Sequence, residues 1–575
     1  MEKNRWIDNK IGQMNIEQKV GQMMVFGFCG TVITPDVIEM ITKYHVGGLR
    51  ITQGCRVITM AHAVRMGTEP EAWIEREIYY PEGANKDYAH VNGAAKCTAK
   101  EYAMVLNRLR DYALDRKSSV GLHFTMDQEG NVAELLSGQR LFPDQMGVAA
   151  SGNPDLAYRI AKSLAKQVRA VGVNMLHSPV LDVNTNQNNP EIGPRSYGSN
   201  PEVVEKFGLE MLRAFNEHSL IATAKHFPGR GESDVDSHFE LPVVNINRKT
   251  LMDVHIAPYK ALIDAGLPSV MIGHSIYPAL DSSDVPSSTS ERIIQGILRE
   301  QLNFKGVITT DNIMMAGIMK KYSIQEAVVL AIIAGCDLIL FRDESPLRIK
   351  IIEHVMDSIK SGRISEKIID DAVTRILAMR WDMGITGNGG KVDPEMAEEP
   401  IQDIQTNKVA NEAAEKCTIL LRNEQEILPL STNKRVLLVE QIHTIHSESN
   451  NLYSHPGLLW EQMCKYSDNV MSVEIPFFPT EADCERVLKR ISEAEVIVMT
   501  NYYHQKMGKG ITEFIKSILM YRKPVIVVAN NPFKFCIADE FESVIVTFCA
   551  GGKENLDAVA KAIFGKIKLT AKLPC

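Results

Sequence analysis

The 575-residue sequence lacks the segments that mark secreted, membrane-bound and nucleic-acid-binding proteins. Its first 28 residues carry charges throughout and contain no uninterrupted apolar core, unlike a signal peptide or a membrane anchor. The longest apolar run, residues 327–341, is too short to span a membrane and contains Asp337. The formal net charge of -8 gives no electrostatic reason to bind nucleic acid or anionic lipid. We therefore expect a small-molecule partner, and neither nucleic acid nor a membrane.

Paired cysteines and nucleotide-binding loops are also missing. None of the 10 cysteines forms a C-x-x-C pair, which suits reduced thiols in a cytoplasmic enzyme better than a disulfide framework or a zinc site. No G-x-x-x-x-G-K-[ST] loop occurs, and no G-x-G-x-x-G follows the first predicted strand. His443 and His446 are not joined by a set of carboxylates and cysteines at the spacing of metal ligands. This favours two solvated histidines over a metal pair. The sequence thus predicts a cytoplasmic protein without a metal.

The pattern of apolar runs predicts an α/β protein of two domains, because this length exceeds what one hydrophobic core supports. Short β-branched or apolar runs alternate with amphipathic helical segments over the first two thirds of the chain, which is typical of a (β/α)8 TIM-type barrel. The eight predicted strands lie near Met23–Phe28, Val46–Ile51, Leu122–Asp127, Val173–His177, Ile221–His226, Ser269–His274, Gly306–Asp311 and Cys336–Phe341.

A glycine-rich, acidic stretch separates the two predicted domains. We predict a barrel over residues 1–383, a linker over residues 384–405 and a smaller α/β domain over residues 406–575. Buried parallel strands are expected in the second domain near Arg435–Glu440, Val496–Met499, Pro524–Ala529 and Val544–Phe548. The segment Thr52–Lys100 is far longer than a usual barrel connection, and long insertions at a barrel mouth are often lids or specificity loops.

Polar side chains gather where the predicted strands end, which is the rim at which barrels build their sites. Asp311 ends an apolar strand in GVITTDNIMMAGI and either projects into a cavity or caps the following helix. Asp236 lies two residues before His238, where a carboxylate can hold an imidazole by one nitrogen and favour its charged form. A loop histidine that contacts only water is the competing interpretation. For the whole set of polar residues at the rim, the competing interpretation is that charged residues simply mark the ends of strands.

The stretch KHFPGRGESDVDSH, residues 225–238, resembles the K-H-F-P-G-H-G-x4-D-S-H signature of glycoside hydrolase family 3, in its β-N-acetylglucosaminidase branch. Other blocks resemble that family in the same order, among them DQEG, SPVLDVNTNQNNPEIGPRSYGSNPE, MIGHSIYPALD and AGCDLILF. The resemblance covers nearly the whole chain. It implies that the barrel is followed by an α/β sandwich domain.

The same resemblance implies a retaining double displacement that needs no metal or organic cofactor. Asp311 would be the nucleophile, and His238 would be the general acid/base, supported by Asp236. The sugar hydroxyls in the terminal subsite would be bound by Asp127, Arg195, Lys225 and His226. Salt bridges that only brace the barrel rim are the alternative for this second group.

Three departures from the family pattern bear on the substrate. DQEGNVAEL is one residue shorter than D-Q-E-G-G-x-V-x-R and places Glu134 at or near an arginine that contacts sugar. Arg230 replaces the second histidine of the loop, and the Thr52–Lys100 insertion is unusual. Glu134 and Arg230 are therefore predicted substrate-binding residues. The Glu134 carboxylate could favour an amine-bearing sugar, whereas Arg230 changes the base of the catalytic loop.

These features predict an exo-acting β-N-acetylhexosaminidase acting on a small glycoside. Other β-hexosaminidases, a β-glucosidase, a glycoside phosphorylase and a non-catalytic sugar-binding protein are the alternatives. In the β-glucosidase branch a glutamate from the second domain serves as acid/base, and the D-S-H sequence argues against that branch.

Overall fold

The structure is a computed structural model that describes thirteen stretches of the chain. They are residues 2–29, 31–52, 98–130, 136, 138–238, 240–341, 347–424, 426–442, 457–476, 479–502, 509–534, 536–549 and 551–574. Within them no helix is long and apolar enough to cross a membrane.

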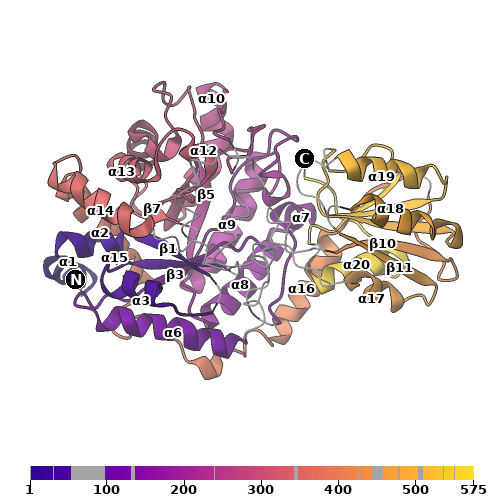
Figure 1. The fold of residues 1–575 in the computed structure, drawn as a ribbon, viewed down its shortest axis with the longest axis horizontal. Helices are drawn as coiled ribbons and strands as arrows, with labels where there is room; N and C mark the ends of the chain where they lie inside the picture. The colour runs from indigo at the N-terminus through magenta and orange to yellow at the C-terminus, as the bar shows by residue number, and fades with distance from the viewer. Residues whose placement is uncertain are drawn as a thin grey trace.

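The N-terminal part of the chain forms a barrel of eight parallel strands, as the sequence predicts (Figure 1). The strand order is β7-β6-β5-β4-β3-β2-β1-β8. Backbone hydrogen bonds from Thr310 N to Leu338 O and from Asp337 N to Ile308 O join β7 to β8 and close the barrel. The strands are β1 (Met24–Cys29), β2 (Gly48–Thr52), β3 (His123–Met126), β4 (Met175–Leu176), β5 (Ile221–Phe227), β6 (Ser269–Ile272), β7 (Val307–Thr310) and β8 (Ile339–Leu340).

Helices follow the strands and cover the outside of the barrel. In α9 (Pro201–Glu217), the Asn200 side chain accepts a hydrogen bond from Glu202 N, and Val204, Phe207 and Met211 are buried on one face. The other helices are α1 (Glu2–Gln13), α2 (Ile16–Gln22), α3 (Pro35–Thr42), α6 (Ala99–Asp115), α7 (Gln145–Ala150), α8 (Pro154–Ala170), α10 (Arg248–Thr250), α11 (Ala257–Asp264), α12 (Ala316–Met319), α13 (Ile324–Ala334), α14 (Leu347–Lys360) and α15 (Glu366–Asp382), with π-helical η5 (Leu251–Ile256) and η7 (Arg292–Gln301).

A second sheet of six strands has its own hydrophobic core, in the part of the chain drawn in orange to yellow in Figure 1. Its order is β11-β10-β12-β13-β14-β9, with all neighbours parallel except the antiparallel pair β14–β9. The strands are β9 (Ile419–Asn423), β10 (Val436–Ile442), β11 (Val470–Pro476), β12 (Val496–Asn501), β13 (Val525–Ala529) and β14 (Ser543–Val546). Its helices are α17 (Leu458–Cys464), α18 (Glu481–Leu488), α19 (Lys509–Leu519) and α20 (Lys553–Ile563). The predicted barrel followed by an α/β sandwich is confirmed.

The barrel and the second sheet pack directly against each other. Met146 and Ala150 of α7 are buried in the core of the second sheet. Asp144 N donates a hydrogen bond to Phe548 O, just beyond β14, and Lys572 N donates one to Ala150 O. α16 (Ile404–Cys417) contacts α7 and α8 on one side and α20 on the other. The boundaries at residues 383 and 406 stay a prediction.

Candidate active site

Asp311 lies at the carboxyl end of β7, inside the mouth of the barrel. Its backbone N–H donates to Ile272 O of β6, and its Oδ1 accepts a hydrogen bond of 2.7 Å from Asn312 N. Burial alone would raise the pKa of Asp311, but Arg230, followed by His274 and His238, outweighs burial and holds the pKa below its usual value. The N-cap of the following helix, α12, is Met315. Asp311 is thus an ionised rim carboxylate and not a helix cap.

His238 and Asp236 form a hydrogen-bonded pair in the loop after β5. His238 Nδ1 lies 2.8 Å from Asp236 Oδ1, and the same oxygen accepts a bond of 2.9 Å from His238 N. The His238 side chain is 36% exposed, whereas that of Asp236 is 8% exposed. Burial would lower the pKa of His238, but the Asp236 carboxylate outweighs it, and the net shift is upward. With Nδ1 engaged, exchange of a proton with a ligand falls to Nε2.

A buried network of charges underlies the other side of the mouth. Lys225 Nζ lies 3.0 Å from Asp127 Oδ1 and 2.6 Å from Glu129 Oε1. Arg195 makes two hydrogen bonds of 2.9 Å to the Glu129 carboxylate, and Arg50 pairs with Asp127. Burial would raise the pKa of Glu129, but the charges of Arg195 and Lys225 outweigh it and lower the pKa to about 2. The network therefore stays ionised and fixes the predicted sugar-binding residues in place.

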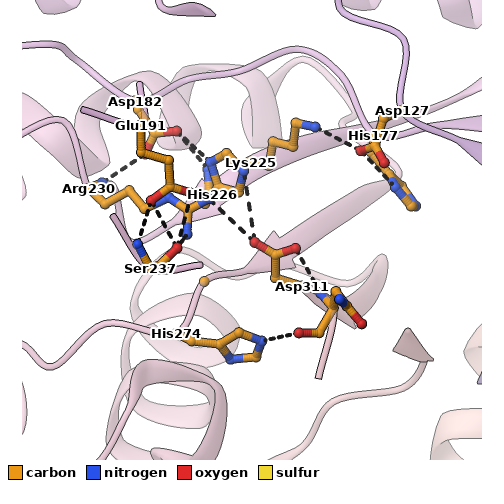
Figure 2. Close-up of polar contacts among 12 residues, drawn as sticks. Asp127, His177, Asp182, Glu191, Lys225, His226, Arg230, Ser237, His274 and Asp311 are labelled. Carbon is orange, nitrogen blue, oxygen red and sulfur yellow. Dashed lines mark hydrogen bonds and ion pairs between the residues drawn. The ribbon is translucent and has the colours of Figure 1, made fainter. Parts of the chain in front are cut away.

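His226 is anchored by Asp182, a carboxylate with no exposed side-chain surface. Asp182 Oδ2 accepts a hydrogen bond from His226 N at 3.2 Å. The same oxygen lies 2.7 Å from His226 Nδ1. On its other side, His226 Nε2 lies 3.5 Å from Arg195 Nη2. The same nitrogen lies 4.0 Å from Asp311 Oδ2 (Figure 2). Burial, reinforced by Arg230, holds the pKa of His226 well below its usual value. A neutral imidazole is therefore held between Arg195 and Asp311.

Arg230 links Asp311 to Glu191 and to Ser237 in the loop of the dyad, as Figure 2 shows. Its side chain is 2% exposed, and its Nη2 lies 2.6 Å from Glu191 Oε1 and 3.4 Å from Asp311 Oδ2. Its Nη1 donates a hydrogen bond of 2.6 Å to Ser237 Oγ, and its backbone N–H donates to Asp182 Oδ1. Burial would lower the pKa of Arg230, but Glu191 and Asp311 outweigh burial and raise it. Arg230 therefore contributes a permanent charge between carboxylates.

Among the described residues, the side chains of Glu191, Asp236 and His238 have the spacing of a metal site, with one ligand atom from each within 4.8 Å of the others. The Arg230 guanidinium already contacts Glu191 at 2.6 Å and opposes a second cation there. We assign no metal to this trio, whose contacts are those of a proton-transfer pair and a neighbouring ion pair.

Two predicted features lie outside the described residues. They are Glu134 and residues 53–97, which make up most of the Thr52–Lys100 insertion. The pair His443 and His446 lies outside them as well. The other predicted site residues come together at the barrel mouth.

The structure adds carboxylates that the reading of the sequence did not single out. Glu129 lies two residues after Asp127, and this spacing could have flagged it. Asp182 follows a predicted strand in SPVLDV and could have been found by the same strand-end argument. Glu191 lies in an irregular loop with no periodic signal, and only its contacts with Arg230 and Ser237 identify it.

Comparisons with known proteins bear on the family and the fold of the chain. The sequence model described as "Glycosyl hydrolase family 3 N terminal domain" matches residues 7–379. A "Beta-N-acetylglucosaminidase/beta-glucosidase" of Cellulomonas fimi is 27% identical over 452 residues, which is 76% of this chain and 70% of that protein. A "Beta-hexosaminidase A" of Pseudoalteromonas piscicida is 31% identical over 296 residues, 48% of this chain and 50% of that protein. The solved structure of a glycoside hydrolase family 3 beta-N-acetylglucosaminidase from Paenibacillus sp. str. FPU-7 matches with a TM-score of 0.83 and 27% identity, covering 98% of each chain.

Proposed function

The chain belongs to glycosyl hydrolase family 3, and on that premise we propose that it removes terminal β-linked N-acetylglucosamine, or a related amino sugar, from small glycosides by a retaining mechanism. The observation that carries the proposal is the pairing at one barrel mouth of an ionised, arginine-bound Asp311 with the raised-pKa dyad of His238 and Asp236. The names of the two relatives and of the solved structure support an amino sugar as the substrate.

In the first step, an Asp311 oxygen forms a bond to the anomeric carbon while the bond to the leaving oxygen breaks. His238 passes its Nε2 proton to that oxygen, and Asp236 stabilises the imidazolium before transfer. In the second step, His238 Nε2 takes a proton from water, the water oxygen bonds to the anomeric carbon, and the Asp311 carboxylate leaves. The second step returns Asp311 to its ionised form and His238 to its protonated form. The proposed chemistry therefore needs two side chains and water.

We propose that the sugar hydroxyls bind over the network around Glu129. Asp127 and Arg195 retain 24% and 23% exposure of their side chains, so a ligand can reach them. Lys225 and His226 are each 3% exposed and lie below that surface, where they hold the carboxylates in place. Glu134 remains a predicted contact that would favour an amine-bearing sugar.

The direct test is the substitution Asp311→Ala, assayed with activated aryl β-N-acetylglucosaminide and a panel of other β-glycosides. We expect turnover to be lost, and we expect a 2-fluoro sugar to label Asp311 in the wild-type protein, as mass spectrometry of its peptides would show. Asp281→Ala is the control, because Asp281 is also largely buried, at 4% exposure against 15% for Asp311, but it hydrogen-bonds Ser283 and Ser290 instead of the groups at the mouth. Unchanged turnover in Asp311→Ala would rule out the proposed nucleophile. Tight sugar binding without cleavage across the panel would favour a binding protein instead.

Water is the proposed acceptor, and phosphate is the second candidate because a neutral imidazole repels phosphate less than a glutamate would. Two carboxylates flank His238 Nδ1, Asp236 at 2.8 Å and Glu191 at 3.5 Å, and their charge opposes an incoming phosphate. Product analysis with and without phosphate separates the two: a sugar 1-phosphate would favour the phosphorylase.

We also propose that the protein works in the cytoplasm. The free thiols of Cys336, Cys417, Cys464, Cys484 and Cys549 support a reducing compartment. Fractionation of the source cells, with the enzyme followed by its activity, tests this location.

A further inference from the structure

An unbroken chain of charged contacts joins the proposed nucleophile to the proposed acid/base. Arg230 uses one nitrogen, Nη2, for both Asp311 Oδ2 at 3.4 Å and Glu191 Oε1 at 2.6 Å. Glu191 in turn uses that same Oε1 to face His238 Nδ1 at 3.5 Å. Arg230 Nη2 and Glu191 Oε1 are thus each shared between two partners. A change in the charge of Asp311 would therefore alter the interaction of Glu191 with His238.

The chain is rigidly held. Ser237 N and Oγ both donate to the Glu191 carboxylate at 2.9 to 3.0 Å, while Ser237 Oγ accepts from Arg230 Nη1. The side chains of Glu191 and Arg230 are 3% and 2% exposed, so water screens their interaction weakly. Ser237 lies between Asp236 and His238 in sequence, which ties Glu191 to the loop that carries the dyad.

We propose that Glu191 and Arg230 are positioning residues that couple the charge of Asp311 to the basicity of His238, so that the imidazole changes from acid to base when the glycosyl-enzyme forms. This inference rests on the proposed retaining mechanism. While Asp311 is ionised, Arg230 is shared between Asp311 and Glu191, and the remaining charge of Glu191 favours the imidazolium. Esterification removes the charge of Asp311, so Arg230 pairs with Glu191 alone. The imidazolium then loses part of its stabilisation at the step in which His238 must accept a proton.

The charged groups that face His238 come from three loops and have opposite effects on the charged form of its imidazole. Asp236 and Glu191 favour the imidazolium, and Arg230 opposes it. Asp311, after β7, interacts with the same imidazole from across the mouth. Glu191 is the member of this set that contacts both the imidazole and the arginine bound to the nucleophile.

The first experiment compares pH profiles of kcat/KM for wild-type protein and Glu191→Gln. Loss of a carboxylate 3.5 Å from Nδ1 is expected to move the alkaline limb downward by about one pH unit. Glu191→Asp keeps the charge and is expected to restore most of the limb. Glu232→Gln is the control, because Glu232 lies on the neighbouring loop after β5, two residues from Arg230 in sequence, and pairs with Thr185 instead of Arg230. An unmoved limb in a folded Glu191→Gln protein overturns the coupling.

The second experiment needs only the wild-type sequence and so can still overturn the inference if the variants do not fold. The pKa of His238 is measured by NMR in labelled protein before and after trapping with a 2-fluoro glycoside. We expect the pKa to fall on trapping, and an unchanged value overturns the inference. Failure of the wild-type protein to turn over any β-glycoside or to be labelled at Asp311 would refute the proposed function itself, which distinguishes the two failures.

Discussion

Replacing Asp236 by asparagine removes the charge beside His238 with little change in shape. The amide oxygen of Asp236→Asn can still accept a hydrogen bond from Nδ1, which lies 2.8 Å from the carboxylate oxygen in the native protein. The orientation of the imidazole is therefore retained, and the loss should be electrostatic. Asp234→Asn is the control, because Asp234 is an exposed carboxylate on the same loop.

The size of the effect follows from the contact. A hydrogen bond to a charged group contributes about 1.5 to 3 kcal/mol, which corresponds to roughly one to two pKa units. The His238 side chain is 36% exposed, so solvent screens the pair, and we expect the smaller end of this range, which would move the alkaline limb of the rate profile by about one pH unit. At pH values well above both the native and the shifted limb, the fraction of protein that carries the acidic proton falls about tenfold.

The assay is kcat/KM against pH for aryl glycosides whose leaving groups differ in acidity. We expect the alkaline limb to move to lower pH in Asp236→Asn. The rate loss should be large for a poor leaving group and small for an acidic phenol, which needs no proton to depart. An equal loss for both leaving groups with an unmoved limb would refute the assignment of the dyad and indicate a purely structural role.

Three further predictions concern stability and packing. Lys225→Met leaves the buried Glu129 and the partly exposed Asp127 without their shared cation and should cost about 3 to 5 kcal/mol in denaturant unfolding; a loss below about 1 kcal/mol would contradict the buried pairing. Gly231→Ala would place a methyl group 1.8 Å from the Val183 carbonyl oxygen and should cost at least about 2 kcal/mol together with activity. Its control, Gly12→Ala in an uncrowded helix, should instead stabilise by about 0.5 to 1 kcal/mol. Because the pKa of Glu129 is lowered from 4.5 to about 2, its contribution to stability is full above pH 4.5 and is lost as pH falls toward 2. Thermal unfolding across that window should show a flatter acid limb in Glu129→Gln, and identical limbs would contradict the shift.

Much of the architecture was predictable because buried parallel strands are continuous apolar runs. All eight barrel strands were located, yet their lengths differ: β4 is confined to Met175–Leu176 and β8 to Ile339–Leu340, because the neighbouring residues do not continue the hydrogen-bonded ladder. β11 (Val470–Pro476) was missed, since it is a partly exposed edge strand with a weak apolar pattern. The antiparallel pairing of β9 is set by its contact with β14, which no local pattern encodes.

The sequence by itself indicated which residues are candidates for the reaction and where the strands that carry them end. Asp311, His238 and Asp236 are identified by strand ends, by a two-residue spacing and by an ordered set of family motifs. Only the tertiary structure decided how the charges pair. Arg230 is separated from Glu191 by 39 positions and from Asp311 by 81, and no periodicity records such a contact. Long-range ion pairs depend on the positions that whole loops take in the folded protein. Arg230, which in the sequence is only a substitution in a motif, is therefore the link between the two proposed catalytic groups in the fold.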